Sequence, residues 1–166
     1  RKSGVLGWQG RVPAIAKYIF QYIFVQSEFA LMCPISVTDT STMLIESYGS
    51  EEVKAKFLPG MTSQDMSTLL KSAQFMTEKT GGSDVGNIEL EARNEDGMWR
   101  LYGEKWFCSC ADGDVALLLA RPEGAIDGSG GLGLFAMPRH LEDGSRNQYR
   151  IVRLKEKLGT RSMASG

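Results

Sequence analysis

The chain contains 166 residues, a length that suits one ordinary domain or one domain with part of another attached. Its 19 basic and 20 acidic side chains leave a formal net charge of -1. This balance gives no overall electrostatic footprint for nucleic acid or for an anionic membrane, so a bound anion needs a local site.

The three cysteines, Cys33, Cys108 and Cys110, are odd in number and lack Cys-x-x-Cys spacing. This pattern disfavours both a disulfide framework and a zinc site. We therefore expect no metal site and a reducing intracellular compartment, either the cytoplasm or a mitochondrion. His140 is the only histidine, and its charged, turn-like surroundings favour a solvated loop residue over a member of a nucleophile system.

One apolar stretch, residues 15–32, raises the question of a membrane span. Lys17, Gln21, Gln26 and Glu28 interrupt it well before about 18 clean apolar residues accumulate. We expect a buried helix there, and no membrane partner.

Before about residue 70, apolar residues recur at helical spacing. Residues 13–33 are expected to form a first helix that Pro34 stops. Residues 40–48 are expected to form a second helix. Ser50 has the chemistry of an N-cap for a third, short helix that ends at Pro59. Three helices in succession indicate a helical half-domain.

After residue 70 the pattern changes to alternation and short apolar runs. Residues 88–93 and 99–107 read as an antiparallel pair joined by hairpin chemistry at residues 94–97. A continuous apolar run at residues 115–121 indicates a buried strand. Two further strands are expected at residues 134–138 and 148–154. The fold class is therefore α+β.

The chain resembles the acyl-CoA dehydrogenase family over nearly its whole length, and four segments carry the resemblance. They are Tyr48-Gly-Ser-Glu-Glu-Val-Lys-Ala-Lys-Phe-Leu-Pro59, Met76-Thr-Glu-Lys-Thr-Gly-Gly-Ser-Asp-Val85, Gly103-Glu-Lys-Trp-Phe-Cys-Ser109 and Arg153-Leu-Lys-Glu-Lys-Leu-Gly-Thr-Arg-Ser162. Lys79, where most members have proline, and Ser109, after Trp-Phe-Cys, look like the adaptive-response (AidB-type) branch.

The resemblance implies a helical N-terminal segment followed by an antiparallel β-barrel or sandwich-like middle domain. Residues 1–69 would be the C-terminal part of the N-terminal helical domain. Residues 70–166 would be the flavin-facing middle domain, in a piece cut before the C-terminal helical domain. The resemblance also implies FAD, a homotetramer and α,β-dehydrogenation of an acyl-CoA thioester, with hydride passing to flavin N5 and an electron-transfer partner for the flavin.

The resemblance places the FAD contacts within residues 74–83 and within residues 107–109. They are Gln74, Phe75, Met76, Thr77, Gly81, Gly82, Ser83, Phe107, Cys108 and Ser109. Hydroxyls such as those of Thr77 and Ser109 are donors that a flavin edge requires. Thr77 and Ser83 are also expected to contact substrate, whereas Cys108 is expected to contribute only backbone.

Each of these interpretations has a plainer alternative. On spacing alone, Gly81-Gly82-Ser83 is an ordinary turn, although it could cradle a pyrophosphate as a nest of backbone N–H groups. Strand alternation would put Trp106 and Phe107 on opposite faces, so at most one should touch a flavin. Arg153, Lys155, Lys157 and Arg161 are more typical of a solvated strand face than of a phosphate patch.

No catalytic acid or base is assigned, because the resemblance places the base in the C-terminal domain, beyond Gly166. Glu78 lies in the motif, but its family counterpart belongs to the loop and is not the base. A second hypothesis is an AidB-like stress-response flavoprotein with nucleic-acid association and weak dehydrogenase activity. Nucleic-acid binding is not indicated by this segment, whose net charge is -1.

Overall fold

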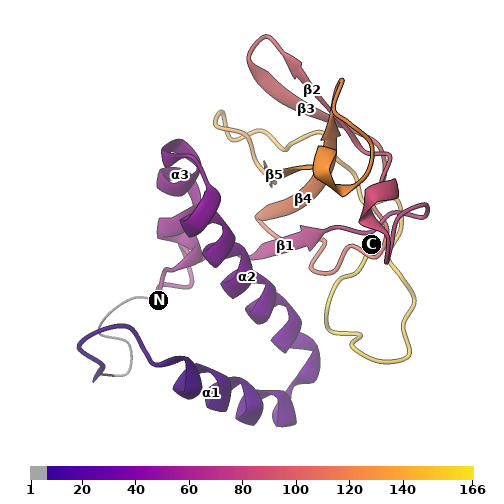
Figure 1. Cartoon of the computed structure of the whole chain (residues 1–166). Helices are drawn as coiled ribbons and strands as arrows, with labels where there is room; N and C mark the ends of the chain where they lie inside the picture. The colour runs from indigo at the N-terminus through magenta and orange to yellow at the C-terminus, as the bar shows by residue number, and fades with distance from the viewer. Residues whose placement is uncertain (1–6) are drawn as a thin grey trace. The chain divides into compact units, whose positions relative to one another are not determined.

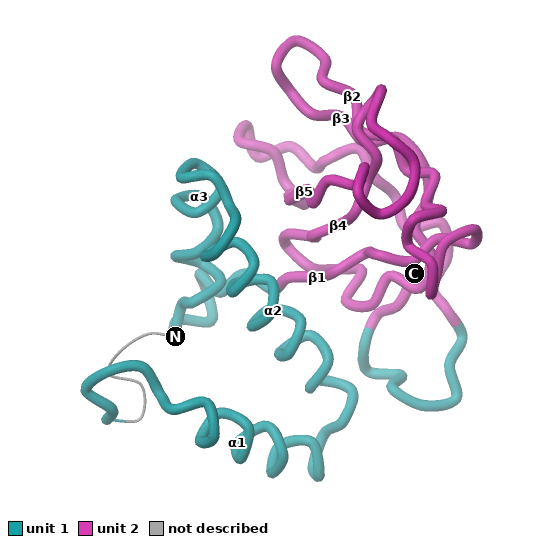
Figure 2. The backbone as a smooth tube through the Cα atoms, viewed as in Figure 1, with its two compact units in different colours: residues 1–71, 156–163 teal, residues 72–155, 164–166 magenta. Residues whose placement is uncertain are grey.

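A computed structural model describes residues 7–166 and divides them into two compact units (Figure 2). Unit 1 contains the helices together with residues 156–163. Unit 2 contains residues 72–155 and 164–166, and it holds all five strands.

Unit 1 is built from α1 (Ala14–Ser27), α2 (Phe29–Tyr48) and α3 (Glu51–Met61) (Figure 1). The chain breaks at Glu28, whose backbone is extended and whose carboxylate accepts hydrogen bonds from Ala30 N and Leu31 N at 2.9 and 3.3 Å. Glu28 therefore caps α2, and the expected break at Pro34 is wrong. Pro34 lies in the second turn of α2, where a proline removes only one backbone hydrogen bond.

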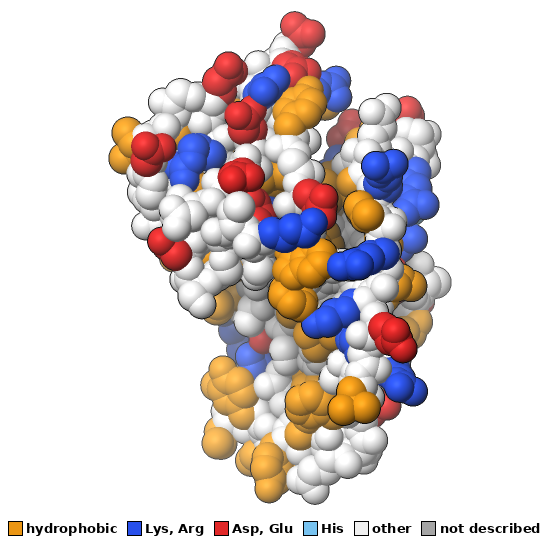
Figure 3. All heavy atoms as spheres, turned by 90° about the vertical axis from the view of Figure 1, so that its right-hand side faces the viewer, with side chains coloured by type: hydrophobic (Ala, Val, Ile, Leu, Met, Phe, Trp, Pro, Cys, Tyr) orange, Lys and Arg blue, Asp and Glu red, His pale blue; other side chains and the backbone are white. Residues whose placement is uncertain are grey.

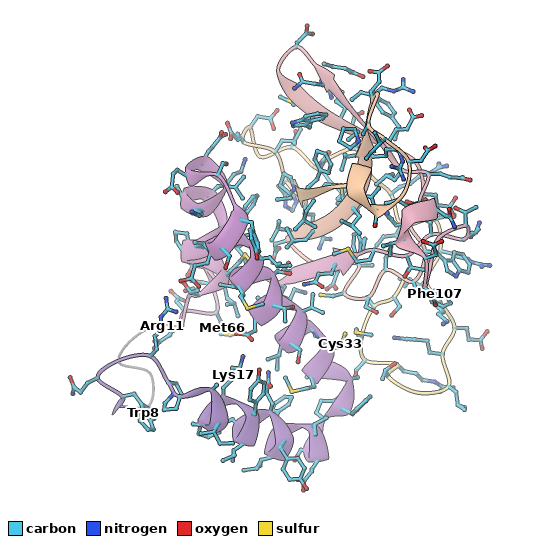
Figure 4. The ribbon with its side chains drawn as sticks, in the orientation of Figure 1. Trp8, Arg11, Lys17, Cys33, Met66 and Phe107 are labelled. Carbon is cyan, nitrogen blue, oxygen red and sulfur yellow. The ribbon has the colours of Figure 1, made fainter. Side chains whose placement is uncertain are left out.

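Polar contacts join the helices of unit 1. Lys17 on α1 pairs with Asp39 on α2 at 2.7 Å, and Figure 4 shows its side chain pointing toward α2. Ser50 caps α3 by accepting a hydrogen bond from Val53 N, as its position in the sequence predicts.

No helix within residues 7–166 is long and apolar enough to cross a membrane.

The sheet of unit 2 is mixed. Its strands are β1 (Ser72–Phe75), β2 (Glu91–Glu95), β3 (Met98–Tyr102), β4 (Val115–Pro122) and β5 (Gly133–Pro138). They follow the order β1-β4-β2-β3, with β5 also paired to β4. The expected succession of helices and β-domain is confirmed, but β4 runs parallel to β1 and β2 and antiparallel only to β5.

Strand β4 is the centre of the core, which explains its continuous apolar sequence. Val115 and Leu117 are among the most completely buried side chains of residues 7–166. A strand covered on both faces carries apolar residues at successive positions rather than at alternate ones. Phe75 of β1 and Leu118 of β4 belong to the same hydrophobic cluster.

Two strand predictions in unit 2 are wrong. Residues 148–154 form no strand, and most of their side chains are exposed. Strand β3 ends at Tyr102 because Gly103 adopts φ +144°, and a Cβ there would lie 2.8 Å from Leu90 Cδ1. Residues 103–107 therefore leave the sheet instead of extending it.

Candidate functional site

The two segments that carry the sequence motifs lie side by side in unit 2. The carbonyl of Thr77 accepts a hydrogen bond from Trp106 N at 2.8 Å. The loop after Thr77 closes on itself, because Glu78 N donates to Gly81 O at 2.9 Å and Gly81 N donates to Glu78 O at 3.3 Å. An added Cβ at Gly81 would lie 2.9 Å from Ile88 Cγ2, so glycine is needed there for space.

A buried ion pair holds this loop in place. Lys105 Nζ lies 2.6 Å from Glu78 Oε1, and the two side chains are only 7% and 5% exposed. The Glu78 carboxylate also accepts hydrogen bonds from Glu89 N at 2.6 Å and Leu90 N at 3.2 Å. Since these residues follow β1, precede β2 and follow β3, one carboxylate ties together the ends of three strands.

Burial shifts two pKa values beside the motif. Desolvation lowers the pKa of Lys105, although the neighbouring Glu78 carboxylate acts in the opposite direction. Desolvation also raises the pKa of the Cys108 thiol from 9.0 to about 11, so Cys108 is a neutral thiol at physiological pH. The raised pKa leaves the Cys108 thiol unsuited to proton transfer near pH 7.

Strand alternation predicts that Trp106 and Phe107 lie on opposite faces of a strand. The structure shows a turn there instead. Phe107 has φ +58°, a left-handed conformation that turns the chain. The two rings pack edge to face with centroids 5.4 Å apart. Half of the Phe107 surface is exposed, and Figure 4 shows the side chain on the outside of unit 2.

Three hydroxyls near this turn have the properties that a flavin edge requires. Thr77 and Ser109 are half-buried, and Ser83 is exposed. Within residues 7–166, none of their side-chain oxygens has a hydrogen-bond partner. Because each hydroxyl can both donate and accept, the donor set fits the ring edge of a flavin, with the exposed Phe107 ring as an apolar surface beside it.

Other predicted contacts do not fit as expected. Gly81 and Gly82 lack a positive φ, and Gly81 N is already bonded, so these residues do not form the expected nest. Cys108 cannot offer its backbone N–H, which donates to Gly166 O at 2.9 Å. The Phe75 ring is buried in the core, Gln74 lies within β1, and the Met76 carbonyl receives a hydrogen bond from Lys105.

Sequence reasoning missed a set of cations stacked on the exposed rings. Lys79 Nζ and Arg153 Cζ lie 5.1 and 5.2 Å from the Trp106 ring centroid. Lys155 Nζ lies 4.0 Å from the Phe107 centroid. Figure 3 shows a face on which basic side chains lie beside hydrophobic ones. The basic character of residues 153–155 was visible in the sequence, but their position against the rings was not.

Unit 2 also contains a cavity of about 650 Å³. Core side chains such as Phe75, Leu118 and Met137 line it together with residues 148–153. Among residues 7–166, no group of three or more histidine, cysteine, aspartate or glutamate side chains could hold a metal ion.

Known proteins identify the family. The model of the acyl-CoA dehydrogenase middle domain matches residues 73–166. The chain belongs to the acyl-CoA dehydrogenase family. This family is FAD-dependent. The chain is similar to acyl-CoA dehydrogenase family member 11 of Caenorhabditis elegans, with 37% identity over 171 residues that cover 95% of this chain and 28% of that protein.

The putative acyl-CoA dehydrogenase AidB of Escherichia coli K12 is 40% identical over 149 residues, which cover 84% of this chain and 26% of AidB. Among solved structures, C. elegans ACDH-11 in complex with C11-CoA superposes with a TM-score of 0.73 and 40% identity. That match covers 80% of this chain and 24% of ACDH-11. The chain thus spans about a quarter of the length of these relatives.

Proposed function

We propose that residues 70–166 form the flavin-facing β-domain of an FAD-dependent acyl-CoA dehydrogenase, and that residues 1–69 form the end of its N-terminal helical domain. When bound, FAD supplies the chemistry of α,β-dehydrogenation by accepting a hydride at N5. The observation that carries the proposal is the hydrogen bond between Thr77 and Trp106, which brings the motif loop beside the turn that carries Phe107 and Ser109.

In this proposal the residues of the chain bind and orient. The hydroxyls of Thr77 and Ser109 donate to flavin acceptors, and Phe107 lies beside the ring. Thr77 and Ser83 meet the thioester end of an acyl-CoA. The Glu78–Lys105 pair fixes the loop that carries Thr77. Glu78 is not the base, because its carboxylate already accepts hydrogen bonds from Lys105 and from two backbone N–H groups.

The finer assignment is to the AidB-type branch. Lys79 in the motif, Ser109 after Trp-Phe-Cys and the 40% identity to AidB support it. For the parent protein we propose a homotetramer that takes an acyl-CoA substrate, passes electrons to a partner of the flavin and works in a reducing compartment. The catalytic base would come from outside residues 1–166.

The flavin site is tested by amide NMR of the 166-residue chain titrated with FMN and FAD. We expect weak binding that shifts the amide signals of Thr77, Phe107 and Ser109. Thr77→Val removes one hydroxyl at nearly constant volume and should weaken binding by about fivefold, the equivalent of one hydrogen bond of roughly 1 kcal/mol. Thr80→Val, in the same loop, is the matched control and should leave the affinity unchanged.

The outcomes are distinct. An absence of shifts at the three amides, or equal losses in both variants, would contradict a flavin site at this turn. A chain that stays stoichiometrically yellow after gel filtration would instead show that our expectation of weak binding is wrong. Reduction of the parent protein's flavin by an acyl-CoA tests the reaction itself.

A second candidate is an AidB-like stress-response flavoprotein with nucleic-acid association and weak dehydrogenase activity. The similarity to AidB is the observation that favours it. Salt-dependent DNA binding by the parent protein, together with no turnover of any acyl-CoA tested, would support this candidate over the dehydrogenase.

A further inference from the structure

Three cations from distant parts of the sequence converge on two neighbouring rings. Lys79 comes from the motif loop, whereas Arg153 and Lys155 come from the irregular segment after β5. Lys79 Nζ and Arg153 Cζ are at most about 10 Å apart, because they lie 5.1 and 5.2 Å from the same Trp106 centroid. Lys155 extends the group over Phe107, whose ring packs against that of Trp106. We call these five residues the cation–ring cluster.

The positive charge of the cluster is only partly compensated. Lys79 forms an exposed ion pair with Glu104 at 3.3 Å. Within residues 7–166, neither Arg153 nor Lys155 forms an ion pair. A multivalent anion placed beside these cations would be attracted by their combined charge. Because each of the three cations is already stacked on a ring, less side-chain entropy is lost on binding.

The chemistry points to phosphate. Arginine and lysine are the usual partners of phosphate oxygens, through a forked donor and a point charge respectively. The motif glycines Gly81 and Gly82, which the sequence offered as a phosphate nest, do not have that geometry. The cluster instead gathers, over the rings of the neighbouring turn, the cations that an anion site requires.

We propose that Lys79, Arg153 and Lys155 bind the phosphate groups of a nucleotide ligand whose other end reaches the Thr77–Ser109 turn. This inference rests on the proposed function. Either the pyrophosphate of FAD or the nucleotide phosphates of coenzyme A carry the required chemistry. Substitutions in the cluster distinguish the two sources. They should weaken the binding of FAD in the first case and of the adenosine bisphosphate end of coenzyme A in the second.

The test uses the indole N–H signal of Trp106 in the 166-residue chain, which has three tryptophans. Inorganic pyrophosphate, the adenosine bisphosphate end of coenzyme A, FAD and FMN are titrated separately. We expect pyrophosphate to shift the Trp106 signal, and its affinity to fall as NaCl rises from about 50 to about 300 mM. Arg153→Gln and Lys155→Gln should each weaken binding about three- to tenfold.

Arg93→Gln is the matched control. Arg93 is also stacked on a ring, that of Tyr102 at 4.9 Å, but it is paired with Glu91 at 2.6 Å. Equal losses in Arg93→Gln and Arg153→Gln would overturn the proposal, because only net charge would then matter. An unmoved Trp106 signal would also overturn it.

The ligand arms separate the remaining outcomes. If a single-stranded oligonucleotide binds more tightly than every small phosphate, with the same variant losses, the surface is a nucleic-acid site and the proposal is wrong. If pyrophosphate binds but FMN shifts no amide at Thr77, the phosphate site stands and the flavin site fails. If FMN and FAD bind equally well and the two cluster variants change nothing, the flavin site stands and the phosphate site fails.

Discussion

Removing the buried Lys105 should destabilise unit 2 more than removing the exposed Lys79 of the motif loop. In Lys105→Met, the carboxylate of Glu78 stays buried with two backbone N–H donors and loses its only cation at 2.6 Å. Breaking a buried pair by removing one partner costs about 3 to 5 kcal/mol. Desolvation, which lowers the pKa of Lys105, already opposes its charge, so we expect the lower end, about 3 kcal/mol.

Lys79→Met is the matched control, because Lys79 is the neighbour of Glu78 in the motif loop and pairs with Glu104 at 3.3 Å. That pair is 64% and 55% exposed, and exposed pairs contribute about 0 to 1 kcal/mol. The two substitutions are chemically identical, so their difference reports chiefly the burial of the Lys105 pair, since Lys79→Met also removes only an exposed contact with the Trp106 ring. A difference of about 2 kcal/mol or more is expected.

The assay is urea unfolding followed by tryptophan fluorescence. Trp99 and Trp106 lie in unit 2, so a Trp8→Phe background restricts the signal to that unit. The double variant Glu78→Gln/Lys105→Met closes a cycle in which the two losses should be non-additive by about 2 kcal/mol. If Lys105→Met costs no more than Lys79→Met, the buried pair does not hold the strand ends together. If Lys105→Met does not fold at all while Lys79→Met does, the loss exceeds our estimate.

Three further predictions concern single positions. Gly81→Ala should lower the free energy of unfolding by about 1 to 3 kcal/mol, because the added Cβ would lie 3.0 Å from the backbone nitrogen of Ile88. Gly82→Ala, whose Cβ would lie 3.7 Å from its nearest neighbour, should change that free energy by less than about 0.5 kcal/mol; urea titrations measure both. Because the pKa of Cys108 is raised in the folded state, its contribution to stability is fully present below pH 9 and is lost as the pH rises to about 11. The free energy of unfolding should fall by up to about 2 kcal/mol over that range. The difference between the wild type and Cys108→Ala measures this loss. Pro34→Ala should stabilise α2 by about 1 to 2 kcal/mol and so raise the thermal midpoint of the helical circular-dichroism signal. Pro13→Ala, at the position just before α1, should leave that midpoint unchanged.

The sequence predicted most of the elements but misplaced the helix break. Pro34 looked like a stop because proline cannot donate to the preceding turn. It is tolerated because α2 starts only five residues earlier, at Phe29, and the Glu28 carboxylate satisfies two of the first N–H groups. A cap by the side chain of the residue just before the helix is local chemistry that the apolar pattern does not register.

The sequence predicted the site residues that belong to a motif. It did not predict contacts between segments that are far apart in the sequence. Thr77 and Ser109 were identified from residue chemistry and family resemblance, and their hydroxyls lack partners within residues 7–166. The contact of Arg153 with Trp106 joins positions far apart in the sequence, so no local pattern encodes it. Residues 153–155 were read as a strand face because alternation is a strand signal, yet they lie outside the sheet.

The distribution of charge explains why this chain should orient a ligand rather than react with it. Its one buried carboxylate on the motif loop, Glu78, is saturated by Lys105 and two backbone donors. The other groups described at the turn are the hydroxyls of Thr77 and Ser109 and the exposed cations, which can position a ring and neutralise phosphate. For the proposed dehydrogenation, we therefore expect the base to reach the turn from outside residues 1–166. In the proposed arrangement the turn contacts a flavin from one side only, so FAD affinity should rise sharply when that outside partner is present.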